Sequence, residues 1–123
     1  DDSVDLREAI NIFSKGLIKP AVAVDFQGFN GLCSARIGEV IFRTCQESVT
    51  NVMRHSSAES LNIIIKKLDD HYQIDIRDDG RVCNSWDFGS GLKGLQERAE
   101  QLLGSFNAYS DNNGFNISLR LPY

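Results

Sequence analysis

The sequence has 123 residues, of which 41% are hydrophobic and 24% are charged, as is usual for a single globular domain. No apolar run approaches the ~18 residues of a membrane helix, and a net charge of −4 argues against a general nucleic-acid binder. The three cysteines lack metal-site spacing, so we expect reduced thiols rather than a zinc site or a disulfide framework.

Hydrophobic periodicity predicts three helices and five strands in a mixed order. Apolar residues at helical spacing predict helices over residues 4–15, 34–55 and 91–103. Short or alternating apolar runs predict strands over residues 20–26, 61–65, 72–76, 105–110 and 115–121. This order favours an α+β two-layer sandwich in which helices cover one face of a mixed sheet.

Some local details of these elements are also expected from the sequence. Ser3 or Asp5 is a candidate cap of the first helix, and His71 is expected to be a surface residue of a hairpin turn. Gly104 is expected to stop the last helix. The last helix is expected to turn five apolar side chains inward: Leu92, Leu95, Ala99, Leu102 and Leu103.

Polar residues occupy the face of the long helix opposite its apolar stripe, namely Arg43, Glu47, Asn51, Arg54 and His55. Glu47 and Asn51 are four residues apart, so their oxygens lie one above the other and offer hard ligands for Mg²⁺. The carboxylate also suits proton transfer or orientation of an attacking group, and the arginines suit phosphate. A solvated helix face with paired charges is the alternative interpretation.

Asp78-Asp79-Gly80 directly follows a predicted strand. A carboxylate at a strand end is well placed to accept a hydrogen bond from a ligand amine, such as that of adenine. Gly80 beside it lets the backbone approach a flat ring. An ordinary Asp-Gly turn is the alternative.

A glycine-rich stretch over residues 89–95 opens the last helix. Glycines at a helix start expose backbone N–H groups to an anion, and Lys93 adds positive charge. The stretch also fits the G-x-G-x-x-G dinucleotide fingerprint. That interpretation fails because the preceding residues 82–88 are polar and loop-like rather than a strand, and too little chain follows.

Taken in order, these three stretches resemble the ATP-binding domain of bacterial sensor histidine kinases, in the superfamily of DNA gyrase, Hsp90 and MutL. Residues 41–55 are similar to its N box, residues 78–80 to its first glycine box and residues 89–99 to its second. The residues of these boxes are most similar to those of the subfamily of nitrate, sugar-phosphate and membrane-fluidity sensors. The resemblance extends over nearly the whole chain and implies the Bergerat ATP-binding fold.

The resemblance also implies roles for individual residues. Asp78 would accept from the adenine amine beside Gly80, and Asn51 would bind Mg²⁺ with Glu47 as second ligand or as the catalytic group. Arg54 and His55 would approach the phosphates. Four residues at the helix start would cradle the triphosphate: Gly89, Gly91, Leu92 and Lys93. Residues 81–88, with Trp86, would form a lid over ATP.

Two positions depart from the family pattern. Val82 stands where the first glycine box usually has another glycine, and Phe115 follows Gly114 where threonine is usual. The first change is expected to stiffen the lid or alter its course, and the second removes a hydroxyl near the nucleotide. Both affect expected affinity and turnover more than they affect the expected fold.

The function implied is that of a catalytic domain that binds Mg-ATP and donates the γ-phosphoryl group to a histidine on a dimerisation helix. Neither His55 nor His71 lies in an acceptor context, so residues 1–123 are expected to be one domain of a larger membrane-anchored sensor, on its cytoplasmic side. Its partners would be that dimerisation domain and a response regulator, with no nucleic acid and no insertion of this domain into the membrane. The alternatives are an anti-sigma-type serine kinase and a degenerate domain used for protein contact.

Overall fold

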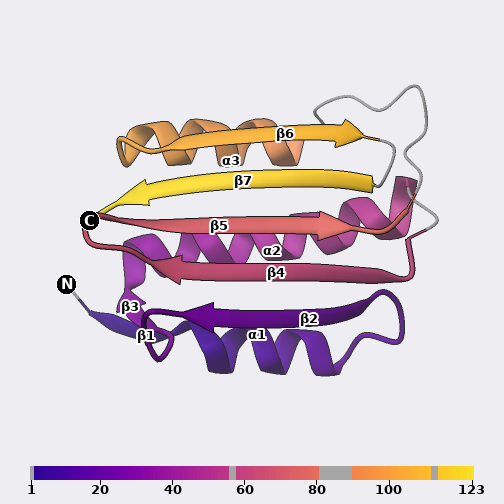
Figure 1. Cartoon of the computed structure of the whole chain (residues 1–123), viewed down its shortest axis with the longest axis horizontal. Coiled ribbons are helices and arrows are strands. Elements are labelled where there is room, and N and C mark those ends of the chain that lie inside the picture. Colours follow the sequence, from indigo (N-terminus) through magenta and orange to yellow (C-terminus); the bar gives the residue numbers. More distant parts are fainter. Residues whose placement is uncertain (1, 56–57, 81–89, 112–113) are drawn as a thin grey trace.

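Three helices cover one face of a five-stranded mixed sheet (Figure 1). The computed structural model describes residues 2–55, 58–80, 90–111 and 114–123. The elements are, in chain order, β1 (Ser3–Asp5), α1 (Leu6–Lys15), β2 (Ala21–Gln27), β3 (Leu32–Ser34), α2 (Ala35–His55), β4 (Ser60–Lys67), β5 (His71–Asp78), α3 (Ser90–Gln101), β6 (Ser105–Asp111) and β7 (Gly114–Pro122). The predicted α+β two-layer sandwich is confirmed.

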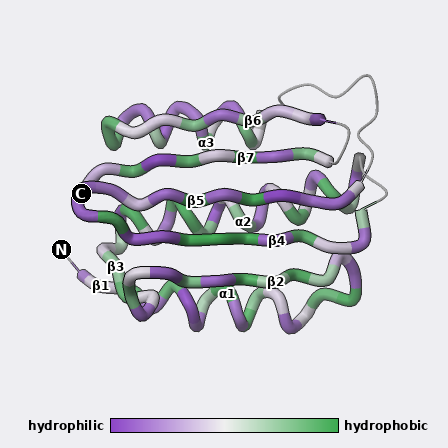
Figure 2. The backbone as a smooth tube through the Cα atoms, viewed as in Figure 1, coloured by the Kyte–Doolittle hydropathy of each residue, from purple (hydrophilic) through white to green (hydrophobic). Residues whose placement is uncertain are grey.

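The sheet has the strand order β2-β4-β5-β7-β6. β2 pairs with β4 in parallel, and every other neighbouring pair is antiparallel. Because side chains alternate between the two faces of a strand, each strand sends every second residue toward the helices. Figure 2 shows how hydrophobic and hydrophilic residues are distributed along the strands and helices. On β4 and β5 the inward residues include Ile63, Ile65, Ile74 and Ile76, all almost fully buried. This face and the helices enclose the hydrophobic core.

The buried stripe of α2 matches the predicted 3.6-residue periodicity. Ile37, Ile41, Cys45, Val49 and Val52 are all at most 9% exposed. Two hydroxyl groups on the same side, of Thr44 and Ser48, are also buried and donate to the carbonyl oxygens four residues earlier, each at 2.7 Å. Although α2 has 21 residues, no described helix has the length and apolar character needed to cross a membrane.

A small two-stranded sheet of β1 and β3 was not predicted from the sequence. Each strand has only three residues, too few for an alternating pattern to be read. As a result the first helix begins at Leu6 rather than at residue 4, and Asp5 caps it by accepting a hydrogen bond from the backbone N–H of Glu8 at 3.0 Å.

Three local predictions were wrong. Leu103 is 84% exposed and adopts a left-handed φ of 63° just after α3, so it does not point inward. Gly104 is not the left-handed residue that ends the helix. Glycine is required there because an added Cβ would lie 2.1 Å from the carbonyl oxygen of Arg120. His71 begins β5, with its side chain only 18% exposed, because the turn ends one residue earlier.

Candidate functional site

The predicted site residues come from separate elements that meet at one end of the sheet. The end of β5, the beginning of β7 and the C-terminal end of α2 lie at the same end of the molecule (Figure 1). Strand ends and helix ends leave backbone donors and acceptors without partners, so polar ligands are readily bound there.

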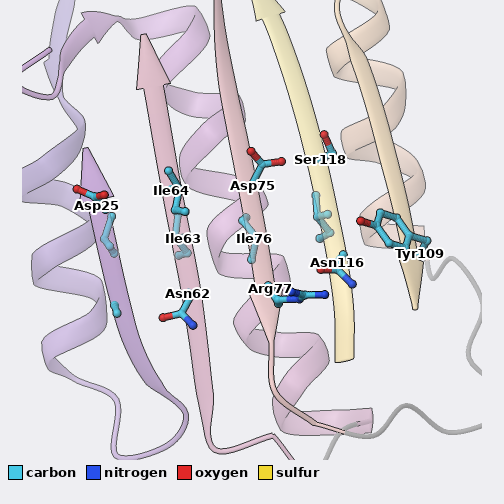
Figure 3. Close-up of a pocket in the computed structure, with 13 residues that line it drawn as sticks. Asp25, Asn62, Ile63, Ile64, Asp75, Ile76, Arg77, Tyr109, Asn116 and Ser118 are labelled. Carbon is cyan, nitrogen blue, oxygen red and sulfur yellow. The ribbon is translucent and has the colours of Figure 1, made fainter. Parts of the chain in front are cut away.

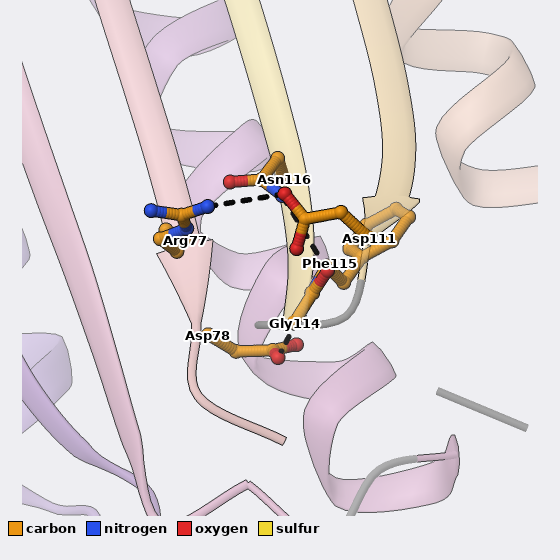
Figure 4. Close-up of polar contacts among 6 residues, drawn as sticks. All are labelled: Arg77, Asp78, Asp111, Gly114, Phe115 and Asn116. Carbon is orange, nitrogen blue, oxygen red and sulfur yellow. Dashed lines mark hydrogen bonds and ion pairs between the residues drawn. The ribbon is translucent and has the colours of Figure 1, made fainter. Parts of the chain in front are cut away.

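Asp78 is the last residue of β5 and is held in a fixed position (Figure 4). It is only 3% exposed. Its Oδ1 atom accepts two backbone hydrogen bonds, from Gly80 N–H at 3.0 Å and from Phe115 N–H at 3.1 Å. Its other carboxylate oxygen, Oδ2, accepts no hydrogen bond within the described residues, so that oxygen is left for a ligand.

Burial raises the pKa of Asp78, and the hydrogen bonds from Phe115 and Gly80 oppose this effect. A buried carboxylate is costly unless its oxygens are well solvated by donors. The Oδ2 oxygen of Asp78, which accepts no hydrogen bond from the described residues, can therefore accept one from an N–H donor.

Gly114 makes this arrangement possible. It has a φ of 142°, and an added Cβ would lie 2.0 Å from the backbone oxygen of Asp78 and 3.0 Å from its Oδ1. Only glycine lets β7 approach the end of β5 so closely. Neither Gly114 nor the backbone of Phe115 was predicted to hold Asp78. The register of β5 with β7 decides this contact. The only sign of it in the sequence was at residues 114–115, where the sequence departs from the family pattern.

Asp79, the next residue, has a structural role. Its carboxylate accepts hydrogen bonds from the backbone N–H of Glu59 at 2.9 Å, from that of Ser60 at 3.1 Å and from the Ser60 hydroxyl at 2.8 Å. The bonds from Ser60 and Glu59 lower the pKa of Asp79. The Asp-Asp-Gly stretch thus combines one aspartate that faces the candidate site with one that fixes the beginning of β4.

Glu47 of α2 lies directly against the beginning of α3. A Cβ added to Gly91 would lie 2.4 Å from the carboxyl carbon of Glu47 and 2.6 Å from each of its oxygens. The carboxylate therefore occupies the space that a side chain at residue 91 would fill. The beginning of α3 and the polar face of α2 are thus in direct contact at this point.

Asn51 lies one turn beyond Glu47 on α2, and its side-chain amide nitrogen is buried. That nitrogen has no hydrogen-bond partner within the described residues. Buried polar groups in native proteins are nearly always satisfied, so this donor is available to a hydrogen-bond acceptor from outside the described residues.

The other predicted site residues are placed as follows. Gly80 is buried beside Asp78, while Arg54 and Lys93 are exposed. Leu92 is 1% exposed, so its side chain belongs to the core and only its backbone is available to a ligand. Gly89, the side chain of His55 and the predicted lid with Trp86 lie outside the described residues, so their roles stay predictions.

Arg43 does not point freely toward a ligand. Its Nε atom lies 3.7 Å from Oε1 of Glu39, and Arg98 of α3 contacts the same oxygen at 2.8 Å. Arg43 and Arg98 line a cavity of about 280 Å³ between α2 and α3, beside Glu47 and Gly91.

Cys45 lies on the buried side of α2, where burial raises the pKa of its thiol to about 12, so it stays protonated.

A larger hollow, of about 620 Å³, opens on the sheet face that the helices leave uncovered. Figure 3 shows polar side chains from all five strands on this face, namely Asp25, Asn62, Asp75, Arg77, Tyr109, Asn116 and Ser118. Arg77 and Asn116 both donate to Asp111 there (Figure 4). None of the predicted site residues lines this hollow, so it is separate from the candidate site.

Comparison with known sequences identifies relatives of the chain. It is 39% identical to the sensor histidine kinase YxjM of Bacillus subtilis over 88 residues, and 34% identical to the sensor histidine kinase DesK of the same organism over 90. These matches cover 70% of this chain, and 21% and 24% of the two relatives. The chain belongs to the catalytic domains of the sensor histidine kinases. It spans about a fifth of the length of the relatives it matches.

Solved structures of histidine kinases have the same fold as this catalytic domain. AdeS of Acinetobacter baumannii superposes with a TM-score of 0.73 at 17% identity, covering 98% of this chain and 66% of that one. The catalytic domain of ThkA superposes with a TM-score of 0.67 at 13% identity, covering 98% and 95%. No family model matches the chain. The assignment to the nitrate, sugar-phosphate and membrane-fluidity subfamily stays a prediction.

Proposed function

We propose that this histidine kinase domain binds Mg-ATP and donates the γ-phosphoryl group to a histidine on a dimerisation helix of the same parent protein. The observation that carries the proposal is the buried carboxylate of Asp78, with one oxygen held by two N–H groups and the other free of hydrogen bonds from described residues. That oxygen suits the exocyclic amine of adenine. Gly80 beside it leaves room for a flat ring.

The residues of α2 are chemically suited to hold Mg²⁺. Glu47 supplies carboxylate oxygens and Asn51 an amide, which are ligand types that Mg²⁺ accepts. Asn51 would bind Mg²⁺ through its amide oxygen, and its buried amide nitrogen, which has no partner within the described residues, would donate a hydrogen bond to a phosphate oxygen. Mg²⁺, when bound, would neutralise phosphate charge that develops during transfer.

The domain itself would contribute to catalysis by positioning the phosphates and by taking or orienting the proton of the acceptor imidazole. The beginning of α3, without a Cβ at Gly91, presents backbone N–H groups to the phosphates. During transfer the bond from the γ-phosphorus to the bridging oxygen breaks, a bond to the acceptor imidazole nitrogen forms, and ADP leaves. Glu47 would take or orient the proton that the imidazole gives up.

Residues 1–123 would form one domain of a membrane-anchored sensor and act on its cytoplasmic side. The dimerisation domain would be its direct partner and a response regulator the next acceptor. The names of the matched relatives support this assignment, since they are sensor histidine kinases. We expect little kinase activity from the domain alone, because neither of its two histidines lies in an acceptor context.

Two alternatives make different predictions. An anti-sigma-type serine kinase would phosphorylate a serine of a protein target, whereas the relatives named above favour the sensor type. A degenerate domain kept for protein contact would not bind nucleotide. Val82 and Phe115, which depart from the family pattern, motivate this second alternative, but the N–H of Phe115 helps to hold Asp78, which favours binding.

Calorimetry with ATP and Mg²⁺ tests the proposal on the chain as it stands. We expect binding, and a change in Trp86 fluorescence that Asp78→Asn abolishes. If the unmodified chain bound neither ATP nor ADP at millimolar concentrations, the proposed function would be wrong. If Asp78→Asn left affinity intact, the adenine contact would be misplaced.

A further inference from the structure

Three polar side chains form a cluster on the uncovered face of the sheet, next to the strand ends that hold Asp78 (Figure 4). Arg77 is the residue before Asp78 on β5, and Asn116 lies directly opposite it on β7. Asp111 ends β6, and its Oδ2 atom accepts from Nη2 of Arg77 at 3.1 Å and from Nδ2 of Asn116 at 3.3 Å. One carboxylate oxygen therefore links three neighbouring strands.

The cluster also restrains the backbone that donates to Asp78. The side-chain amide of Asn116, which donates to Asp111, lies 3.4 Å from the carbonyl oxygen of Gly114 and donates to it as well. Phe115 lies between these two residues, and its N–H is one of the two donors to Asp78 Oδ1. The φ of Gly114 is 142°, in a region where glycine has much freedom, so its own sterics fix this strand start only weakly. The contacts of Asn116 supply the restraint.

Asp78 and the cluster lie on opposite faces of the sheet. Side chains alternate along a strand, so Asp78 points toward the helices and its neighbour Arg77 points away from them. Asp78 is 3% exposed, whereas the side chain of Arg77 is 50% exposed. The cluster is thus outside the candidate nucleotide site, and the backbone of β7 connects the two.

The ion pair in this cluster explains little as a stabilising contact. The side chains of Arg77 and Asp111 are 50% and 37% exposed, and ion pairs so exposed contribute little to the free energy of unfolding because water screens them. The position of the pair, where β5, β7 and β6 lie side by side next to Asp78, is more informative than its strength.

We propose that Asp111 is a positioning residue for adenine recognition, which acts by aligning the N–H of Phe115 with Asp78. The inference rests on the proposed function, because Asp78 must be the adenine contact. The plane of a carboxylate is set by a torsion with a broad minimum, so hydrogen bonds rather than rotamer preference fix it. A shift of the Phe115 N–H would let the carboxylate turn, and its Oδ2 would lose its direction toward the exocyclic amine.

Two nucleotides that differ by this amine provide the test. Purine riboside triphosphate lacks the exocyclic amine of ATP but keeps the ring, the ribose and the phosphates. In calorimetry with Mg²⁺, we expect the unmodified chain to bind the analogue about tenfold or more weakly than ATP. Asp111→Ala should reduce this ratio about threefold or more, chiefly by weakening ATP. Arg77→Met, which removes the donor at the other end of the ion pair, should lower the ratio in the same direction.

A conservative variant and a matched control complete the set. Asp111→Asn keeps an oxygen that can accept from Arg77 and Asn116, so it should retain most of the discrimination. Asp75→Ala removes an aspartate from the same face of β5, where its carboxylate accepts from Gln73 of the same strand at 3.2 Å. This control should keep the ratio of the unmodified chain.

The outcomes separate this inference from the proposed function. If the unmodified chain discriminated between the nucleotides and both Asp111→Ala and Arg77→Met discriminated equally well, the inference would be wrong and the proposed function would stand. If Asp111→Ala weakened both nucleotides by the same factor, its role would be structural and the inference would again be wrong. If the unmodified chain bound both nucleotides equally, the adenine contact at Asp78 would fail together with the inference. If it bound neither, the proposed function itself would fail.

Discussion

Asp78 and Asp79 are neighbours in the sequence, and their pKa values are shifted in opposite directions. Burial raises the pKa of Asp78, whereas hydrogen bonds from Ser60 and Glu59 lower the pKa of Asp79. A carboxylate with a raised pKa in a folded protein destabilises the fold when it is charged, while one with a lowered pKa stabilises it. The charged form of Asp78 therefore costs stability, whereas the charged form of Asp79 contributes to it.

Asp78→Asn should separate binding from folding. The asparagine oxygen can still accept from Gly80 and Phe115, but its NH₂ group would face the amine of adenine, donor against donor. We expect affinity for Mg-ATP to fall roughly ten- to a hundredfold, equivalent to about 1.5–3 kcal/mol for a hydrogen bond to a charged group. Calorimetry measures the affinity, and urea unfolding at pH 7 should show stability equal to or above that of the wild type.

The stability difference between the wild type and Asp78→Asn should depend on pH, because the pKa of Asp78 is raised. Below the ordinary value of 3.8, Asp78 is protonated in both the folded and the unfolded state, and its contribution to stability is fully present. That contribution is lost as the pH rises through the higher folded-state pKa. Any advantage of Asp78→Asn at pH 7 should therefore shrink as the pH falls toward 3.8, and an advantage that grew in acid would contradict the assignment.

Asp79→Ala should have the opposite effect on stability at pH 7 and the opposite dependence of that effect on pH. Removal of this carboxylate frees the N–H groups of Glu59 and Ser60, so we expect a lower urea midpoint at pH 7. Because the folded-state pKa of Asp79 is lowered, its contribution is present above 3.8 and disappears as the pH falls through the folded value. Urea unfolding curves at pH 7 and at several acid values measure this difference. A variant that folded as stably as the wild type at pH 7 would show that β4 begins without this anchor.

At the scale of elements, the three helices were the most predictable features. The buried stripe of α2 repeats at 3.6 residues over about four turns, from Ile37 to Val52, so the pattern is difficult to misread. The end of α3 was less predictable, because a tertiary contact decides it. Gly104 is required by the carbonyl oxygen of Arg120, whereas Leu103 adopts the left-handed conformation that glycine usually takes at a helix end.

The two glycines of α3 should respond differently to alanine. Gly94→Ala places a methyl group in open space, so helix propensity alone should raise the free energy of unfolding by up to about 1 kcal/mol. Gly91→Ala brings a Cβ within 2.4–2.6 Å of the Glu47 carboxylate, which must then move. We expect Gly91→Ala to gain less stability than Gly94→Ala, or to lose some, in urea unfolding. Equal gains for both variants would show that Glu47 does not lie against α3 in solution.

At the scale of the whole molecule, the order of the motifs predicts which residues belong to the candidate site, but not how those residues contact one another. Glu47, Asn51 and Asp78 stand out in the sequence because their types are unusual for a helix face or a strand end. The contact of Glu47 with Gly91 joins residues 44 positions apart, and that of Asp78 with Phe115 joins residues 37 apart. Both depend on helix packing or strand register, which local patterns do not encode.

Because the site is assembled from α2, β5, α3 and β7, only the folded chain should bind nucleotide. A ligand that binds only the folded state at a hundred times its Kd stabilises it by about 2.7 kcal/mol. For a domain of this size, that corresponds to a rise in Tm of about 10 °C. We expect this rise with Mg-ATP in scanning calorimetry, and at most about half of it with Asp78→Asn at the same concentration, because the variant binds about ten- to a hundredfold more weakly. A rise of similar size in the variant would place the bound nucleotide away from the end of β5, because Asp78 would then contribute nothing to the affinity.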